Sequence, residues 1–369
     1  MKKFLALAIF TFAAVIGCGT SSTPNPAAAA RGYSGTASVG DFLSITVDAT
    51  AHTITYTNHS NGDTGTVPYT ENANGTYTIN DPTGNFVSAY ELPNYGLLIE
   101  ATKTGPNHNT PALITAIQKA TISLATFSAN QYNYIQFRTA AGGMEVGSVS
   151  INAQGDISNS SYWPYGGLGL GQSPNPFNSG TFPGTSLTAD PSGNFLKLAD
   201  DGGSGFDYIF GTQSGLFAVD TPNGAILGFK KAATKDFDPA FAGTYKAVYY
   251  EKTGAATGVG NVETGTADLG HVSIAVDAVG HVTISDLQGA IVLQATLTPV
   301  ADTAYLYDGT ANELHDPCFG LFTMRIVHGP GDSQDIFVTF VDRAMLFSSF
   351  ATVSRTGSGY EYMYGVGLK

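Results

Sequence analysis

The segment SIAVDAVGH, residues 273–281, carries the pattern that decides the fold. Asp277 is followed three residues later by Gly280, which favours a type I turn with glycine in the left-handed position of a bulged hairpin loop. Pairing Val276 with Val282 across this turn gathers five apolar side chains on one face: Val272, Ile274, Val276, Val282 and Ile284. A slip of one residue would put the apolar sets of the two strands on opposite faces. The segment therefore predicts a β-hairpin whose register is specified by burial.

The same signature occurs twice more in the chain. SITVDATAH spans residues 44–52 and SINAQGD spans residues 150–156, so the three copies begin 106 and 123 residues apart. The turn DPTGNF at residues 81–86 returns as DPSGNF at residues 190–195, in the same order and at a similar spacing. Ordered matches at one spacing indicate an internal repeat. We predict a triplicated unit, with copies at residues 31–128, 129–240 and 241–369.

Strand and turn patterns fill these units. Apolar and polar residues alternate in short stretches about every 10 to 15 residues, with turn residues between them. Charged residues make up only 12% of the chain and glycine numbers 45, a composition that suits strands and tight turns better than helices. We therefore predict an all-β protein of three related antiparallel β-meander units in tandem, each a small barrel or a sandwich.

Two points of the fold stay open. The turns at residues 81–86 and 190–195 are similar to those within propeller blades, so a single β-propeller is the alternative, although blades repeat roughly every 40 to 50 residues. Residues 111–119 have apolar positions spaced for one face of a helix. They also occupy the place in the repeat that a strand takes in the second unit, so both structures are compatible with the pattern.

The first 18 residues, MKKFLALAIFTFAAVIGC, have the pattern of an export signal. Lys2 and Lys3 precede an apolar core too short to span a bilayer stably, and the segment closes on VIGC at residues 15–18. This ending resembles the lipobox of bacterial lipoproteins. The resemblance implies that residues 1–17 are a signal peptide cleaved before Cys18, which then carries a diacylglycerol and an acyl chain such as palmitate. With Gly19 after the cysteine, it also implies the outer membrane.

Residues 18–30 have no apolar periodicity and are interpreted as the lipidated cysteine with a flexible linker. Removal of Lys2 and Lys3 leaves 14 basic against 29 acidic residues, a net charge of −15. Such a surface repels nucleic acid and anionic headgroups, so we expect the membrane contact to be the lipid itself. If Cys18 is lipidated, Cys318 has no cysteine partner, and stability must come from apolar burial and sheet hydrogen bonds.

The best candidate for a contact surface is an aromatic stretch, Tyr162, Trp163 and Tyr165, which opens a loop rich in glycine and proline. Aromatic rings in long loops on rigid sheets stack on sugars or pack against peptides. We therefore predict that this loop contacts a glycan or an envelope protein. The alternative is a loop whose rings simply cover the sheet.

A weak candidate for calcium binding is the glycine loop bounded by Asp200, Asp201 and Asp207. Carboxylate oxygens suit calcium, but their spacing here does not match a calcium loop, which alternates its ligands and closes on a bidentate glutamate. A solvated turn is the preferred interpretation, and we expect neither a metal nor a cofactor.

A nucleophile and a base lie close together in sequence at His315 and Cys318. Catalytic cysteines meet their bases in space and not by adjacency, so we expect an inert, buried cysteine. His271 and His281 lie five strand positions apart in the register argued above, roughly 16 Å, and so do not share an ion.

The sequence thus predicts a lipid-anchored envelope protein that acts as a binding or structural module without catalytic activity. One alternative is a carbohydrate-active enzyme, which requires two inward carboxylates at a defined separation in one cleft. A second alternative is a carrier of a small apolar ligand, which requires an apolar cavity inside at least one unit.

Overall fold

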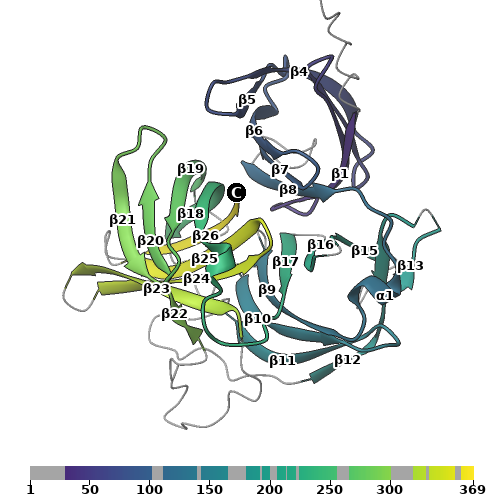
Figure 1. Cartoon of the computed structure of the whole chain (residues 1–369). Coiled ribbons are helices and arrows are strands. Elements are labelled where there is room, and N and C mark those ends of the chain that lie inside the picture. Colours follow the sequence, from purple (N-terminus) through teal and green to yellow (C-terminus); the bar gives the residue numbers. More distant parts are fainter. Residues whose placement is uncertain are drawn as a thin grey trace, which may run out of the picture.

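Three antiparallel sheets follow one another along the chain (Figure 1). The computed structural model describes residues 30–101, 111–138, 143–164, 180–191, 193–199, 206–212, 214–221, 224–255, 266–300, 319–329, 332–353 and 359–369. The predicted class, an all-β chain of barrel-like meander units in tandem, is confirmed. The propeller alternative is wrong, because the strands form three separate meanders and not radial blades.

The first unit is a closed barrel of eight strands: β1 (Arg31–Ala37), β2 (Phe42–Asp48), β3 (Thr53–Asn58), β4 (Thr64–Glu71), β5 (Thr76–Ile79), β6 (Phe86–Leu92), β7 (Gly96–Ala101) and β8 (Ala112–Gln118). Each strand pairs with the next, and β1 also pairs with β8. Closure removes the exposed strand edges that an open sheet would present.

The second unit contains α1 (Leu124–Phe127), β9 (Asn130–Arg138), β10 (Gly143–Ile151), β11 (Asp156–Pro164), β12 (Gly180–Ser186), β13 (Thr188–Ala189), β14 (Leu196–Ala199), β15 (Phe206–Gly211), β16 (Leu216–Thr221) and β17 (Gly224–Lys230). The third contains η1 (Pro239–Phe241), β18 (Gly243–Ala255), β19 (Thr266–Val276), β20 (His281–Ser285), β21 (Ile291–Thr296), β22 (Thr298–Pro299), β23 (Leu321–Gly329), β24 (Asp332–Val341), β25 (Ala344–Val353) and β26 (Gly359–Leu368).

Both later units repeat the meander of the first. Their first and last strands pair, β9 with β17 and β18 with β26, as β1 does with β8. Within the described residues, however, the strand order ends at β12 and β13 in one unit and at β21 and β22 in the other. The second and third barrels are therefore open where the first is closed by the pairing of β4 with β5.

The three signature segments form the hairpin between the second and third strands of each unit. In the third unit Val276 pairs with Val282, which confirms the predicted register. The turn residues His52, Gly155 and Gly280 all have positive φ, at 51°, 89° and 85°. Their carbonyl oxygens accept hydrogen bonds of 2.9, 3.2 and 2.9 Å from the backbone N–H groups of Tyr69, Leu187 and Leu297. The repeat thus extends from the sequence to individual backbone hydrogen bonds.

The segment that the sequence left open, residues 111–119, forms strand β8. Residues from Ala112 to Ile117 are all buried, so the strand shows no alternation between buried and exposed positions. Ile114 and Ala116 point into the first barrel, whereas Leu113 and Ile117 pack outside it against the other units. A strand covered on both faces reads as a continuous apolar run, which periodicity alone does not separate from a buried helix.

Apolar side chains gather in four clusters. One fills the interior of each barrel, and the fourth lies between the barrels and draws residues from all three units. Leu113 of the first unit, Phe137 of the second and Tyr364 of the third are members of this shared core. The units therefore each enclose a core and also share one.

Aromatic rings lie over glycines directly opposite them on neighbouring strands. The cross-strand pairs are Tyr56 with Gly65, Phe217 with Gly228, Tyr249 with Gly270 and Phe347 with Gly365. A Cβ atom on Gly65 would lie 2.8 Å from the Tyr56 ring, and one on Gly228 would overlap the ring of Phe217. Glycine at these positions makes room for a ring that shields the strand from above.

We expect Gly228→Ala to lower the free energy of unfolding by about 1–3 kcal/mol, because the added methyl group forces the Phe217 ring out of its place in the core. Gly32→Ala is the matched control, since a Cβ there meets only the Lys119 side chain at an ordinary 3.7 Å. Chemical denaturation of both variants measures the difference. Equal unfolding midpoints would contradict the role of the glycine.

Candidate functional site

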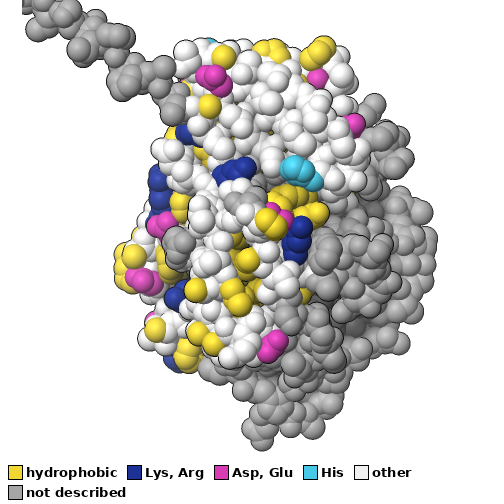
Figure 2. Space-filling model, turned by 90° about the vertical axis from the view of Figure 1, so that its right-hand side faces the viewer, with side chains coloured by type: hydrophobic (Ala, Val, Ile, Leu, Met, Phe, Trp, Pro, Cys, Tyr) yellow, Lys and Arg dark blue, Asp and Glu magenta, His cyan; other side chains and the backbone are white. Residues whose placement is uncertain are grey.

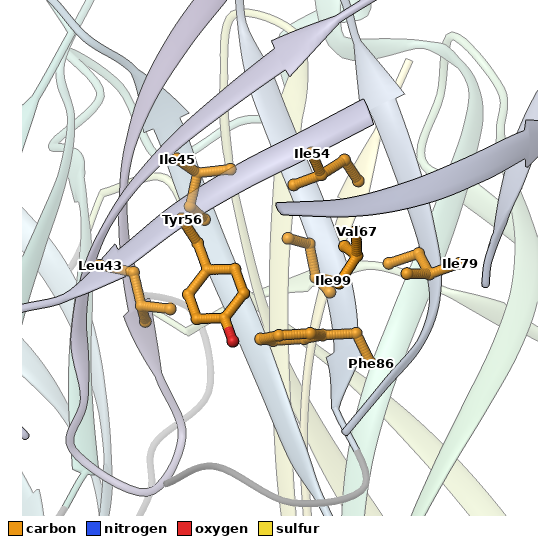
Figure 3. Close-up of a pocket in the computed structure, with 8 residues that line it drawn as sticks. All are labelled: Leu43, Ile45, Ile54, Tyr56, Val67, Ile79, Phe86 and Ile99. Carbon is orange, nitrogen blue, oxygen red and sulfur yellow. The ribbon is translucent and has the colours of Figure 1, made fainter. Parts of the chain in front are cut away.

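The interior of the first barrel holds an apolar cavity at one end (Figure 3). Eight side chains from six strands line it, and the gap among them has room for about one water molecule: Leu43, Ile45, Ile54, Tyr56, Val67, Ile79, Phe86 and Ile99. Tyr56 and Phe86 are half-buried while the other six are buried. A carrier of a small apolar ligand requires an apolar cavity with room for that ligand, and this gap in the first barrel is too small for one.

The opposite end of the same barrel is closed by a buried carboxylate. Both oxygens of Glu91 accept a hydrogen bond of 2.6 Å from the Arg31 guanidinium, through Nε and Nη2. The hydroxyl groups of Tyr33 and Tyr77 donate to the same carboxylate at 2.5 and 2.6 Å. The Glu91 side chain is fully buried and that of Arg31 is 12% exposed. Four donors thus satisfy one buried anion.

The protonation equilibrium of this cluster follows from its contacts. Burial by itself raises the pKa of Glu91, but the hydrogen bonds from Arg31, Tyr33 and Tyr77 together hold that pKa below its ordinary value. Burial and the neighbouring carboxylate raise the pKa of both tyrosines. Glu91 is therefore an anion at neutral pH and is held in place by fixed donors.

The later units close the equivalent end with aromatic rings. Glu91 pairs with Leu97, and the equivalent pairs are Gly211 with Phe217 and Phe340 with Met345. In the second unit α1 places the Phe127 ring against Gly211, where a Cβ atom would meet it at 3.0 Å. In the third unit Phe241 of η1 stacks on Phe340 with ring centroids 5.6 Å apart.

Tyr132 and Tyr245 stand where Tyr33 stands in the first barrel and show the same contrast. Their hydroxyl groups donate to the carbonyl oxygens of Phe127 and Phe241, at 3.2 and 2.6 Å. Tyr33 donates to Glu91 instead. The charged cluster is thus a feature of the first unit alone among the described residues.

A serine, a glutamate and a histidine meet where the first barrel contacts the third unit. His271 Nε2 lies 2.7 Å from Glu100 Oε1, and Ser88 donates to the other carboxylate oxygen. The Ser88 hydroxyl lies 3.4 Å from the same Nε2 atom. A catalytic triad binds its acid and its serine on different ring nitrogens, so this arrangement is not a triad. Although burial raises the pKa of Glu100, the hydrogen bonds from His271 and Ser88 bring it below its ordinary value.

Carboxylates also gather where the first barrel meets the second unit. Asp220, which is 6% exposed, accepts a hydrogen bond of 3.0 Å from Thr36. Burial, together with the charges of Asp207 and Asp41, raises the pKa of Asp220 to about 8. Asp41 is 2% exposed, and its Oδ2 has no hydrogen-bond partner within the described chain. Asp220 is therefore neutral at pH 7 and adds no buried negative charge to the interface between the two units.

Several predicted site residues lie outside the described residues: Cys18, Tyr165, Asp200, Asp201, His315, Asp316 and Cys318. The backbone of Tyr162 and Trp163 forms the end of β11, opposite Gly147 and Val146 of β10. Asp207 lies in β15, half-buried and near Asp220. In the part of the chain that is described, no group of three histidine, cysteine or carboxylate side chains is placed to hold a metal ion.

The two histidines considered as a pair have separate partners. His281 Nδ1 lies 2.8 Å from Asp277 Oδ2 on an exposed turn, whereas His271 binds Glu100. Sequence analysis missed Glu91, Glu100 and Asp220. Each is a lone carboxylate within an apolar strand. This position is the sequence feature from which their burial could have been predicted.

No helix among the described residues has the length and apolarity that a membrane crossing requires.

We expect Arg31→Ala to lower the free energy of unfolding by about 3–5 kcal/mol at neutral pH, since it leaves the buried Glu91 anion without its main partner. A folded-state pKa below the ordinary value contributes stability above the unfolded pKa, and this contribution is lost as the pH falls through the folded pKa. The gap between wild type and variant should therefore shrink in acid. Lys197→Ala is the control, because it breaks the more exposed pair with Asp190 and should change the free energy of unfolding far less.

We expect Asp220→Asn to stabilise the protein at and above pH 8. A carboxyl group whose folded pKa is raised to about 8 contributes stability below its unfolded pKa and loses it as the pH rises through 8. Replacement by an amide removes up to about 1.4 kcal/mol per pH unit of this dependence. Unfolding midpoints between pH 6 and 9 test the slope, with the half-buried Asp48→Asn at the end of β2 as control. A slope equal to that of wild type would show that Asp220 is ionised at neutral pH.

No family model matches the chain, and no curated protein matches it. Among solved structures, a double mutant of transferrin binding protein B from Haemophilus parasuis Hp5 aligns with a TM-score of 0.30 and 11% identity, over 90% of this chain and 66% of that chain. Transferrin binding protein B from serogroup B Neisseria meningitidis aligns with a TM-score of 0.28 and 11% identity, over 89% of this chain and 66% of that one. The intact Ap-TbpB protein, with its N and C lobes, gives a TM-score of 0.24 at 10% identity, over 92% of this chain and 77% of that one. Likeness at these TM-scores supports no argument about function, and the description of the fold rests on the strand pairing alone.

Proposed function

We propose that this chain is a lipid-anchored protein of the bacterial envelope, held at the outer membrane through Cys18, and that it acts as a binding or structural module without catalytic activity. The proposal combines the lipobox pattern of residues 15–18 with the arrangement of the three barrels. Strand β1 begins at Arg31, directly after residues 18–30, which the sequence predicts to be the linker.

The shared core supports a role as a scaffold. Side chains of all three barrels pack together in it, and directional bonds cross between the units at its margins. Tyr364 of the third unit bonds the Thr115 hydroxyl of the first at 3.0 Å. Asn133 of the second unit donates to the Phe319 carbonyl of the third at 2.8 Å. Barrels held in this way present their loops in a fixed arrangement.

The connection between the third and fourth strands of each unit supports a binding role. In the third unit it is a hairpin with three exposed apolar residues: Leu287 at 56%, Ile291 at 62% and Val292 at 65% exposure. In the second unit it begins with Tyr162 and Trp163 at the end of β11. In the first unit the same connection, residues 59–63, is polar. Exposed apolar groups such as those of the third unit are typical of contact surfaces.

The charge of the chain limits the partner. A net charge of −15 after removal of the signal peptide disfavours phosphate-rich partners. Figure 2 shows one face on which charged side chains of both signs are scattered among hydrophobic and other uncharged atoms, without a patch of one charge. A neutral glycan or an envelope protein with an apolar contact is therefore the partner we propose.

The gap inside the first barrel gives no support to a carrier of a small apolar ligand, because it has room for about one water molecule. For a carbohydrate-active enzyme the inward carboxylate Glu91 is poorly suited, because both of its oxygens are already bonded to Arg31. Glu100 is likewise bonded to His271 and Ser88.

A crosslinking experiment in living cells tests the proposed function. Bacteria expressing the full chain are fed an alkyne-tagged palmitate, and a photo-crosslinking residue replaces Trp163, Val292 or Asn61. We expect the chain to carry the palmitate label, and positions 163 and 292 to form adducts with envelope components. Position 61, on the polar connection of the first unit, should form few adducts.

Two cysteine variants complete the experiment. Cys18→Ser should abolish the palmitate label and the adducts, whereas Cys318→Ser should retain both. An unlabelled wild-type chain would overturn the lipid anchor. Equal adducts at positions 61, 163 and 292 would overturn the contact role of the third-to-fourth-strand connections.

A further inference from the structure

We propose that the junction between the first barrel and the second unit takes up one proton when it closes, shared by Asp41 and Asp220, so that acid tightens this junction and alkali loosens it. This inference goes beyond the proposed function, because it concerns the contact between two units of one chain and not the surfaces offered to a partner. It makes the arrangement of the units respond to pH.

Aromatic rings form the apolar part of this junction. Phe42, the first residue of β2, stacks on Tyr208 of β15 with ring centroids 4.7 Å apart. The rings of Phe195 and Phe210, also from the second unit, lie with their centroids 5.6 Å from that of Phe42. Phe42 is 2% exposed, so the rings exclude water from the space beside them. A carboxylate next to this contact is therefore poorly solvated.

Two carboxyl groups lie beside these rings, one from each unit. Asp41 directly precedes Phe42, and Asp220 is paired across the strands with Tyr208. Asp220 reaches the first barrel, since it accepts a hydrogen bond of 3.0 Å from Thr36 of β1. The two carboxyl groups are near enough for the charge of Asp41 to act on Asp220. The junction thus brings two acidic groups together away from water.

One of these groups lacks a hydrogen-bond donor. Asp41 Oδ2 is buried and has no partner within the described chain, and such an oxygen is costly to leave unbonded. The charges that act on Asp220 within the described chain are those of Asp207 and Asp41, and no lysine or arginine is among them. A proton carried by Asp220 removes one of the buried charges and offers Asp41 the donor that it lacks.

The direction of the pH effect follows from the two states of the junction. In the closed state burial, together with the charges of Asp207 and Asp41, raises the pKa of Asp220 to about 8. In the open state Asp220 meets water and regains an ordinary pKa of about 3.9. Between these values closing takes up one proton, so the ratio of open to closed molecules rises about tenfold per pH unit. Above pH 8 Asp220 is ionised in both states and the ratio is constant.

A histidine at the same junction has the opposite effect. The His59 ring stacks on Phe42 with centroids 5.2 Å apart, and burial, then the charge of Lys119, lowers its pKa. Closing therefore releases a proton from His59, but only below the ordinary histidine pKa of about 6.5. The interval from pH 6.5 to 8 thus separates the effect of Asp220 from that of His59.

Thiol trapping measures how often the junction opens. In the mature chain, residues 18–369 with Cys18→Ser and Cys318→Ser, Ala218→Cys places a thiol in the shared core. Its alkylation rate is divided by that of an exposed thiol, Gln154→Cys, which removes the pH dependence of the thiol itself. We expect this ratio to rise about tenfold per pH unit from pH 6.5 to 8 and to level off above pH 8.

Three variants test the shared proton. Asp220→Asn should abolish the slope, because an amide stays neutral throughout this interval. Asp41→Asn should make the ratio level off at a lower pH, because it removes a charge that opposes the ionisation of Asp220 and supplies a donor. Asp48→Asn, at the opposite end of β2, is the matched control and should keep the wild-type profile. A slope that survives Asp220→Asn, or a wild-type profile in Asp41→Asn, would contradict the proposal.

A further thiol separates opening of the junction from unfolding of the whole chain. Ala247→Cys lies in the interior of the third unit, where the residue is 2% exposed. We expect the thiol at position 247 to react at least about tenfold more slowly than the thiol at position 218, because the third unit stays folded when the junction opens. Equal rates would show that only global unfolding was trapped and would sink the proposal. The chain carries no lipid here, so the result is independent of the proposed anchor.

Discussion

The arrangement of this protein depends on one constraint: three barrels bury parts of their outer faces against one another. The strands that pair first with last in each unit, such as β8, β9 and β26, contribute to this shared core. They are therefore buried on both faces along much of their length, as β8 shows. Because the same strands line their own barrels, the shared core ties the interior packing of each unit to the position of its neighbours.

The sequence predicted contacts between residues that lie close together in the chain, but it did not predict contacts between residues far apart in the chain. The pairing of Val276 with Val282 was accessible because a turn joins the two strands and only one register buries both apolar sets. The strand at β8 was ambiguous, because its second buried face is covered by other units and not by its own barrel. Glu91 binds a partner 60 residues away, and Asp220 bonds a residue 184 positions away. No spacing rule connects residues over such distances, so the candidate site emerged only from the fold.

The three units differ in the side chains that close the equivalent end of each barrel. The second and third units are each preceded by a helical turn that supplies Phe127 or Phe241 to close one barrel end. In the first unit Arg31 of β1 provides the closing group through its ion pair with Glu91. A buried ion pair is a less stabilising plug than an aromatic ring of similar volume, but it is directional. The ion pair with Glu91 therefore holds the Arg31 side chain in a single geometry at the first residue of β1.

Directional bonds of this kind also explain how the barrels find one arrangement. Apolar packing in the shared core is strong but tolerates many orientations, since it depends on area and not on direction. The bonds from Tyr364 to Thr115, from His271 to Glu100 and from Thr36 to Asp220 cross between units at separate points around that core. In any other orientation of the barrels these buried groups would lose their partners at a cost of about 1–3 kcal/mol each. The apolar contact therefore supplies most of the association energy, while the polar contacts select the orientation of the three barrels.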